Sequence, residues 1–226
     1  MGKGQDLVFL HGYGSSKEAF TAQISYFSRF FRVTAIDFLG FGKSKPLDAP
    51  FSVADYAEWT IEVLSALGVE TPCAAAHSFG CRVAVKMSGE YGYPFKKLLL
   101  TGPAGVIMNR GFGYHCKVLA YKICKKLAPA FAEKHFGSAE YRALDGVMRE
   151  SYKKIVNEDL RECAKSVGCK VLIAEGEQDG VTPLREAKAY LRSFPNANLK
   201  TLRGGHFAFA ENPVAFNLIA EEFFYE

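Results

Sequence analysis

Short runs of apolar and β-branched residues alternate along the chain with segments of helical periodicity, and this alternation limits the fold more than any other feature. The runs predict strands at residues 7–10, 33–36, 73–76, 98–100, 171–174 and 199–202. Helical patterns fall between them, at residues 17–30, 53–67, 79–91, 183–191 and 213–224. Such strands, joined through helices, form a parallel sheet that is covered on both faces. We therefore predict a three-layer α/β/α sandwich with a mostly parallel sheet of about six strands.

The helix predicted at residues 53–67 has the clearest limits. Its apolar positions recur at spacings of three and four residues, which is the period of one helix face. Ser52 precedes it and is suited to cap its N-terminus, and Gly68 is suited to end it.

One segment interrupts the alternation. Residues 106–165 contain helical patterns and no predicted strand, so we interpret them as a helical cap inserted into one core made of residues 1–105 and 166–226. Residues 107–165 hold 12 Lys or Arg against 7 Asp or Glu, whereas the rest of the chain holds 16 against 17. A basic amphipathic helix can attract acidic ligands or anionic surfaces. We favour the plainer interpretation, a solvated helix face.

The composition is that of an ordinary globular protein, with 49% hydrophobic and 23% charged residues in a chain of 226. No apolar run approaches the roughly 18 residues of a membrane span, and the N-terminus lacks a signal-peptide pattern. We expect a cytoplasmic protein without membrane association. The six cysteines form no C-x-x-C pair, so we expect free thiols and no metal site. No nucleic-acid recognition motif is present, so nucleic acid is not an expected partner.

Ser78 lies between a predicted strand and a predicted helix, in the sequence Ala76-His77-Ser78-Phe79-Gly80. A turn this tight needs small side chains two residues before and two residues after the serine. It would hold the hydroxyl at a helix N-terminus, where backbone N–H groups favour developing negative charge. The alternative is a serine that only caps the helix.

A serine hydroxyl needs a neighbouring base to act as a nucleophile at neutral pH. Asp179 follows one later strand, in Gly-Glu-Gln-Asp-Gly-Val-Thr-Pro, and His206 follows the last, in Gly-Gly-His-Phe. Residues that follow parallel strands gather at one edge of the sheet. We therefore expect Ser78, His206 and Asp179 to converge as nucleophile, base and orienting acid. Two alternatives stay open: Glu177 could be the acid, and His206 could be a packed loop residue.

Taken together, five motifs in this order resemble the α/β-hydrolase superfamily: HGYG at 11–14, DFLGFGKS at 37–44, AHSFG at 76–80, GEQDGVTP at 176–183 and GGHF at 204–207. The resemblance covers nearly the whole chain except the cap. It implies a fold that needs no cofactor and hosts esterases, thioesterases, carbon–carbon hydrolases and some lyases. The backbone N–H groups of Tyr13 and Phe79 would form the oxyanion hole.

The chain departs from the family pattern at three points. Ala76 replaces the first glycine of the serine turn, and Leu39 stands where many relatives have proline. The two strands that usually come first are missing, which leaves residues 33–36 at an edge of the sheet. Because an exposed edge invites pairing, we hypothesise a homodimer formed through it.

The expected reaction is hydrolysis of a small or medium carboxylic ester or thioester through an acyl-enzyme on Ser78. The cap offers five residues as walls for an apolar acyl group: Ile107, Met108, Phe112, Tyr114 and Tyr141. One alternative is a carbon–carbon bond hydrolase or lyase that uses the same three residues on an acidic keto substrate. The other is a non-catalytic binding protein that has kept the fold.

Overall fold

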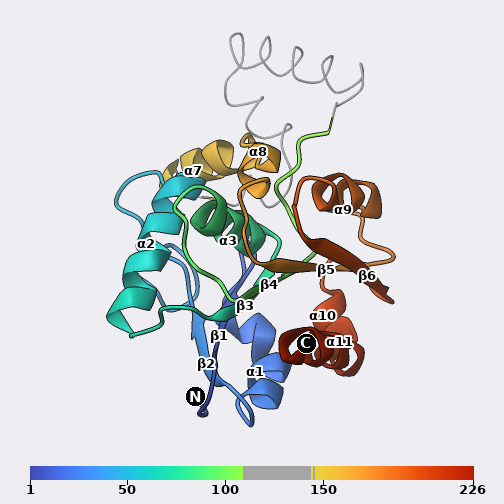
Figure 1. Cartoon of the computed structure of the whole chain (residues 1–226). Helices are drawn as coiled ribbons and strands as arrows, with labels where there is room; N and C mark the ends of the chain where they lie inside the picture. The colour runs from blue at the N-terminus through green and yellow to red at the C-terminus, as the bar shows by residue number, and fades with distance from the viewer. Residues whose placement is uncertain (109–143, 145) are drawn as a thin grey trace.

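The computed structural model describes residues 1–108, 144 and 146–226 (Figure 1). All six predicted strands form, and they make one parallel sheet in the order β2-β1-β3-β4-β5-β6. The strands are β1 (Asp6–Leu10), β2 (Arg32–Ile36), β3 (Cys73–His77), β4 (Lys97–Thr101), β5 (Lys170–Gly176) and β6 (Ala197–Leu202). The predicted α/β fold class is therefore confirmed.

Helices cover both faces of the sheet, which gives the three layers visible in Figure 1. One face packs against α2 (Val53–Ala66), α3 (Phe79–Gly89), α7 (Gly146–Val156), α8 (Arg161–Ala164) and α9 (Leu184–Leu191). The other packs against η1 (Lys17–Phe20), α1 (Thr21–Phe27), α10 (Ala208–Glu211) and α11 (Pro213–Tyr225).

The strands supply apolar side chains to both layers because successive residues point to opposite faces. In β1, Val8 and Leu10 join the cluster beneath α2 and α3, whereas Leu7 and Phe9 join the cluster beneath α1 and α11. All four side chains are buried. This two-sided burial explains why the strand is a continuous apolar run.

Helix α2 begins and ends where the sequence predicts. The Ser52 hydroxyl accepts a hydrogen bond from the Asp55 N–H at 3.2 Å, and the Asp55 carboxylate accepts one from the Ser52 N–H at 2.6 Å. A cap of this kind stabilises a helix by about 1 kcal/mol. Gly68 follows the helix with φ of +64°, a conformation that glycine adopts at little cost.

The single helix predicted at residues 17–30 is wrong in two respects, because it is not continuous and it ends at Phe27. The segment divides into the 3₁₀ turn η1 and the α-helix α1. The Thr21 hydroxyl donates to the Glu18 carbonyl at 2.6 Å, and the Lys17 N–H donates to Asp37 Oδ1 at 2.8 Å. Side-chain bonds of this kind compete with a regular helical ladder.

Strands β2 and β6 form the two edges of the sheet. On β2, the Val33 N–H donates to the Met1 carbonyl at 2.6 Å, and the Met1 amino group donates to the Val33 carbonyl at 2.7 Å. The strand order confirms the predicted position of β2 at an edge, but the outer side of this edge is already paired with Met1 at Val33. Pairing of two copies through this strand stays a prediction.

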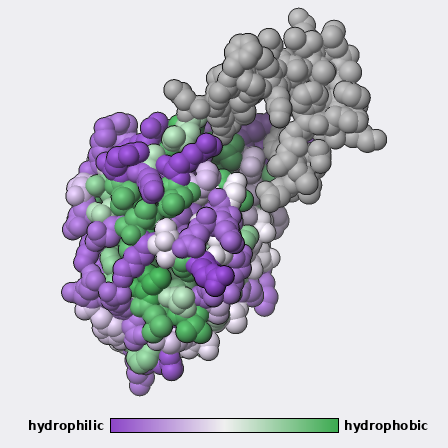
Figure 2. Space-filling view, turned by 90° about the vertical axis from the view of Figure 1, so that its right-hand side faces the viewer, coloured by the Kyte–Doolittle hydropathy of each residue, from purple (hydrophilic) through white to green (hydrophobic). Residues whose placement is uncertain are grey.

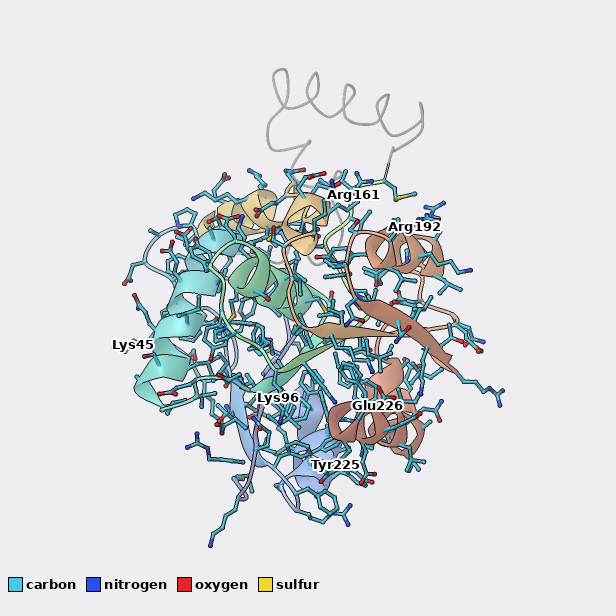
Figure 3. The ribbon with its side chains drawn as sticks, in the orientation of Figure 1. Lys45, Lys96, Arg161, Arg192, Tyr225 and Glu226 are labelled. Atoms are coloured by element: carbon cyan, nitrogen blue, oxygen red, sulfur yellow. The ribbon has the colours of Figure 1, made fainter. Side chains whose placement is uncertain are left out.

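The C-terminus is fastened to the sheet. Figure 3 labels Tyr225 and Glu226 at the end of α11, where the Tyr225 ring lies 5.7 Å from the Phe31 ring. The Glu226 carboxylate forms an ion pair with Lys170 at the start of β5. The first contact joins α11 to the residue before β2, and the second joins the chain end to the first residue of β5.

Part of the predicted cap lies within the described residues. Met148 of α7 and Ala164 of α8 belong to the same buried cluster as α2 and α3. Between them, the Glu158 carbonyl accepts a hydrogen bond from the buried Arg82 at 2.7 Å. The rest of the cap, residues 109–143 and 145, lies outside the described residues, as do Phe112, Tyr114 and Tyr141.

The cysteines, possible metal sites and possible membrane-spanning helices can be followed only within the described residues. Four of the six cysteines are described, and all four are free thiols, as predicted. Within residues 1–108 and 146–226, no group of His, Cys, Asp or Glu could hold a metal ion. No helix in those ranges has the length and apolar character needed to span a bilayer.

Candidate active site

Ser78 occupies the junction between β3 and α3 in an unusual backbone conformation. Its φ of 49° is the only positive value at a non-glycine residue in the part of the chain described. Such a conformation costs on the order of 1–3 kcal/mol and persists only where the surroundings enforce it. Here the Ser78 N–H donates to the Thr101 carbonyl and the Ser78 carbonyl accepts from the Cys81 N–H, both at 3.1 Å.

Small residues around the turn let the neighbouring backbone approach. A Cβ atom on Gly80 would stand 2.3 Å from the Leu10 carbonyl oxygen, so no larger side chain fits there. A Cβ atom on Gly12 would stand 2.7 Å from Nδ1 of His77. Ala76 is fully buried, and its methyl group is accommodated where glycine is usual. The substitution that the sequence shows at this position therefore leaves the turn intact.

The structure brings Ser78, His206 and Asp179 into one hydrogen-bonded line. His206 Nε2 lies 3.0 Å from Ser78 Oγ, and His206 Nδ1 lies 2.7 Å from Asp179 Oδ2. The Asp179 side chain is fully buried, and that of His206 is 12% exposed. The contacts join residues 128 and 27 positions apart in the chain. This arrangement can remove the proton from the serine hydroxyl.

Asp179 is held as an anion by four hydrogen bonds. Its Oδ1 accepts from the N–H groups of Val181 and Thr182 at 2.7 and 2.9 Å, and its Oδ2 accepts from the Thr182 hydroxyl at 2.9 Å and from His206. Burial on its own would raise the pKa of Asp179, but these bonds outweigh it and hold the pKa far below the usual range.

The alternative acid, Glu177, is exposed and precedes Asp179 by two residues in the chain. Among the described residues, no hydrogen bond joins the Glu177 side chain to His206. Asp179 is thus the carboxylate in a position to orient the histidine.

His77 contacts the histidine loop rather than Ser78. Its Nε2–H donates to the His206 carbonyl at 2.9 Å, and its ring lies 4.7 Å from the His206 ring. Burial lowers the pKa of His77 to about 3, so this ring is neutral. It is a structural support for the loop.

The loop after β1 carries Tyr13, whose N–H is expected in the oxyanion hole. His11 Nδ1–H donates to the Gly12 carbonyl at 2.8 Å, while His11 Nε2 accepts from the Phe38 N–H at 3.0 Å. The Gly12 carbonyl and the Tyr13 N–H belong to one planar peptide unit. Fixing the carbonyl on one side therefore fixes the direction of the N–H on the other.

Phe79, the second expected oxyanion donor, is the first residue of α3. The first N–H groups of a helix have no partner within the helix, so they can point at a ligand. The Tyr13 and Phe79 rings lie 5.7 Å apart, which brings the two loops together beside Ser78. A role for both N–H groups in catalysis stays a prediction.

Residues 7–217 match the model of the alpha/beta hydrolase family. The chain belongs to this family. The match begins within β1, just before the first of the five motifs, and reaches into α11. The family resemblance that the sequence indicated is confirmed.

Two named relatives of this alpha/beta hydrolase are hydrolases of different substrates. Over 87 residues it is 36% identical to the (E)-2-((N-methylformamido)methylene)succinate hydrolase of Acinetobacter baylyi, a match of 38% of this chain and 33% of that protein. It is 25% identical to the 2-hydroxymuconate semialdehyde hydrolase of Pseudomonas putida, across 100% of this chain and 89% of that one. The first match spans only a third of the relative.

Solved structures share the hydrolase fold over nearly all of their length. An esterase from Exiguobacterium antarcticum superposes with a TM-score of 0.80 at 20% identity, covering 100% of this chain and 94% of its own. A meta-cleavage product hydrolase from Pseudomonas fluorescens gives a TM-score of 0.77 at 22% identity, covering 100% and 92%.

Thr182 is a residue of this site that the sequence analysis did not single out. Its hydroxyl donates to Asp179 Oδ2 and also lies 3.3 Å from His206 Nδ1. The only sequence signal was its place in the Asp-Gly-Val-Thr stretch, where the residues that follow an aspartate can fold back onto its carboxylate.

Glu175 is a second acid near the site of the hydrolase, and its environment is the opposite of that of Asp179. It is fully buried near the end of β5, and neither of its carboxyl oxygens has a hydrogen-bond partner among the described residues. Burial first, and then the negative charge of Asp179, raises its pKa to about 9. Glu175 is therefore a neutral carboxylic acid at pH 7, while Asp179 is ionised.

Replacing Glu175 with glutamine is expected to make the fold more stable at neutral and mildly alkaline pH. In the unfolded chain the carboxyl ionises near pH 4.5, so between that pH and about 9 the folded state holds one proton more. Stability then falls with rising pH by about 1.4 kcal/mol per pH unit from this group. Glutamine imitates the neutral form without that loss. We expect Glu175→Gln to gain about 4 kcal/mol at pH 7.5, since that pH lies three units above the ionisation of the unfolded carboxyl.

Urea unfolding of both proteins at pH 5 and pH 7.5 measures the effect. The difference in free energy of unfolding should be small at pH 5 and grow with pH. A difference that is the same at both values would mean that Glu175 is ionised in the folded protein.

Proposed function

We propose that this alpha/beta hydrolase is a serine hydrolase that cleaves a small or medium carboxylic ester or thioester. The observation that carries the proposal is the 3.0 Å separation between His206 Nε2 and Ser78 Oγ, with His206 Nδ1 held by Asp179. A serine hydroxyl in contact with a correctly oriented imidazole is the arrangement that acyl transfer requires.

The first half of the proposed reaction forms an acyl-enzyme. Ser78 Oγ attacks the substrate carbonyl carbon while His206 Nε2 takes the hydroxyl proton. The N–H groups of Tyr13 and Phe79 stabilise the resulting oxyanion. When the tetrahedral intermediate collapses, the bond to the leaving group breaks and His206 gives its proton to the departing alcohol or thiol. Asp179 stabilises the imidazolium throughout without taking a proton.

The second half releases the acid. A water molecule attacks the acyl carbon while His206 Nε2 takes one of its protons. The second tetrahedral intermediate breaks its bond to Ser78 Oγ, and His206 returns the proton to that oxygen. The carboxylic acid leaves and the free serine is restored. Each step is carried by side chains and backbone groups of this chain.

Two exposed apolar side chains support an apolar acyl group. Val181 is 66% exposed two residues after Asp179, and Phe207 is 43% exposed directly after His206. Figure 2 views the side of the molecule that carries α9 and β6, and it shows hydrophobic areas between hydrophilic ones. Exposed apolar side chains beside reactive groups favour a substrate with a hydrocarbon part.

A second candidate is hydrolysis of a carbon–carbon bond in an acidic keto substrate by the same three residues. It is supported by the likeness to the 2-hydroxymuconate semialdehyde hydrolase, which extends over the whole of this chain. The excess of basic residues between 107 and 165 would favour an acidic substrate.

A substrate panel separates the two candidates. The panel pairs p-nitrophenyl esters and acyl thioesters of two to eight carbons with a vinylogous keto acid. We expect kcat/KM for the best ester or thioester to exceed that for the keto acid by at least tenfold. Turnover of the keto acid alone would replace the proposal with the second candidate. Turnover of neither class would reject both and favour a non-catalytic binding protein.

A further inference from the structure

The Tyr13 side chain leaves the loop after β1 and reaches α7. Its hydroxyl donates a hydrogen bond to the Met148 carbonyl at 2.9 Å, across 135 positions of the chain. Its ring lies 5.1 Å from the Tyr152 ring, one turn further along the same helix, in an edge-to-face arrangement. The residue whose N–H is expected to meet the oxyanion is thus attached to a helix of the predicted cap segment.

Helix α7 is a firm anchor because it is itself held to the core at several points. Ser151 Oγ accepts from the Phe51 N–H at 2.9 Å, and the Lys154 ammonium donates to the Pro50 carbonyl at 2.7 Å. A Cβ atom on Gly40 would stand 2.7 Å from the Met148 sulfur, so α7 also lies directly against the loop that follows β2.

The peptide between Gly12 and Tyr13 is therefore held from two sides. His11 and the Ser15 N–H bind the Gly12 carbonyl at 2.8 and 3.2 Å, which fixes one side of the peptide plane. On the other side, the Tyr13 side chain is held by the Met148 carbonyl and by the Phe41 ring, 4.8 Å away. Rotation of this peptide would move its N–H, so both anchors bear on its direction.

We propose that the Tyr13 side chain is a positioning residue that uses α7 to aim the Tyr13 N–H at the oxyanion. This inference rests on the proposed function of Ser78 and adds a role for a side chain that touches no reacting atom. An oxyanion donor works only within a narrow range of distance from the developing charge. The hydroxyl bond to α7 therefore contributes to the rate of acyl transfer and not to the binding of the substrate.

Tyr13→Phe tests the proposal, because it removes the hydroxyl and keeps the ring. Loss of a whole oxyanion donor lowers kcat by about 10²- to 10³-fold, so a misdirected donor should lower it by roughly 10- to 100-fold. KM should change by less than about twofold. The matched control is Tyr56→Phe. The Tyr56 hydroxyl also donates to a backbone carbonyl, that of Leu39, at 3.0 Å. The Tyr56 ring lies 5.0 Å from the Phe79 ring, so the control likewise removes a hydroxyl near the expected oxyanion hole. It should keep kcat within about threefold.

A trifluoromethyl ketone separates this inference from the proposed function, since it adds reversibly to a nucleophilic serine and forms an oxyanion. Its inhibition constant should rise in Tyr13→Phe by the same factor by which kcat/KM falls. Equal inhibition of the wild type and Tyr13→Phe would overturn the role of the tyrosine alone. Failure to inhibit the wild type would overturn the proposed function.

A second variant keeps the test valid if Tyr13→Phe does not fold. Tyr152→Leu removes the ring against which Tyr13 rests and leaves Tyr13 itself unchanged. It should lower kcat in the same direction, by a smaller factor, with an unchanged KM. A rise in KM at constant kcat would indicate a contact with substrate and contradict the proposal.

Discussion

Replacing Ser78 with alanine is expected to lower kcat for ester hydrolysis by about 10⁴- to 10⁶-fold. The variant lacks the oxygen that forms the acyl-enzyme, and His206 then has no proton to take from residue 78. The oxyanion donors and the substrate contacts would remain, so a small residual rate above that in water is expected. Steady-state kinetics with a p-nitrophenyl ester at saturating concentration measures the loss.

The Ser78→Ala variant should keep the fold. The serine side chain contributes one hydrogen bond, to His206. Alanine also has a Cβ atom, so the substitution does not change the steric cost of the φ of 49° at this position. Circular dichroism and the midpoint of urea unfolding check this. A variant that folds as the wild type does and still turns over at more than a hundredth of its rate would contradict a nucleophilic serine at this position.

Replacing Asp179 with asparagine is expected to lower kcat by about 10⁴-fold. The asparagine amide can donate to His206 Nδ1, which would turn the ring to the tautomer that carries its proton on Nε2. Nε2 could then no longer accept the Ser78 proton. The substitution also removes the charge that receives four hydrogen bonds, so some loss of stability is expected as well.

Glu177→Gln is the matched control for Asp179→Asn. Glu177 is exposed in the same loop, and the change is likewise from a carboxylate to an amide. Its kcat should stay within about twofold of the wild type. If Glu177→Gln lost activity and Asp179→Asn did not, Glu177 would be the acid and the loop would have to rearrange.

Most of the fold could be predicted from the sequence because it depends on local patterns. The apolar run at 98–100 is buried on both sides of the sheet, and it therefore reads as a strand without any knowledge of its neighbours. Ser52 and Gly68 mark the ends of α2 through interactions within a few residues. The convergence of Ser78, Asp179 and His206 followed from the rule that parallel strands end at one edge.

The features that escaped prediction depend on contacts that a linear pattern does not encode. The bond from Tyr13 to the Met148 carbonyl spans 135 positions and involves a backbone atom, which has no sequence signature. Glu175 lies in a strand among apolar residues, and only the fold shows that its carboxyl is buried near a second acid. The division of residues 17–27 into η1 and α1 arises from side-chain bonds to Glu18 and Asp37.

Covalent labelling of the wild-type protein tests the central claim most directly, that His206 makes the Ser78 oxygen a nucleophile. In the reaction with a fluorophosphonate, Ser78 Oγ forms a bond to phosphorus, fluoride leaves, and the hydroxyl proton passes through His206 to solvent. Mass spectrometry of the intact and digested protein should find one adduct per chain, on the peptide that contains Ser78. An unlabelled protein, or an adduct on another residue with Ser78 untouched, would contradict the account.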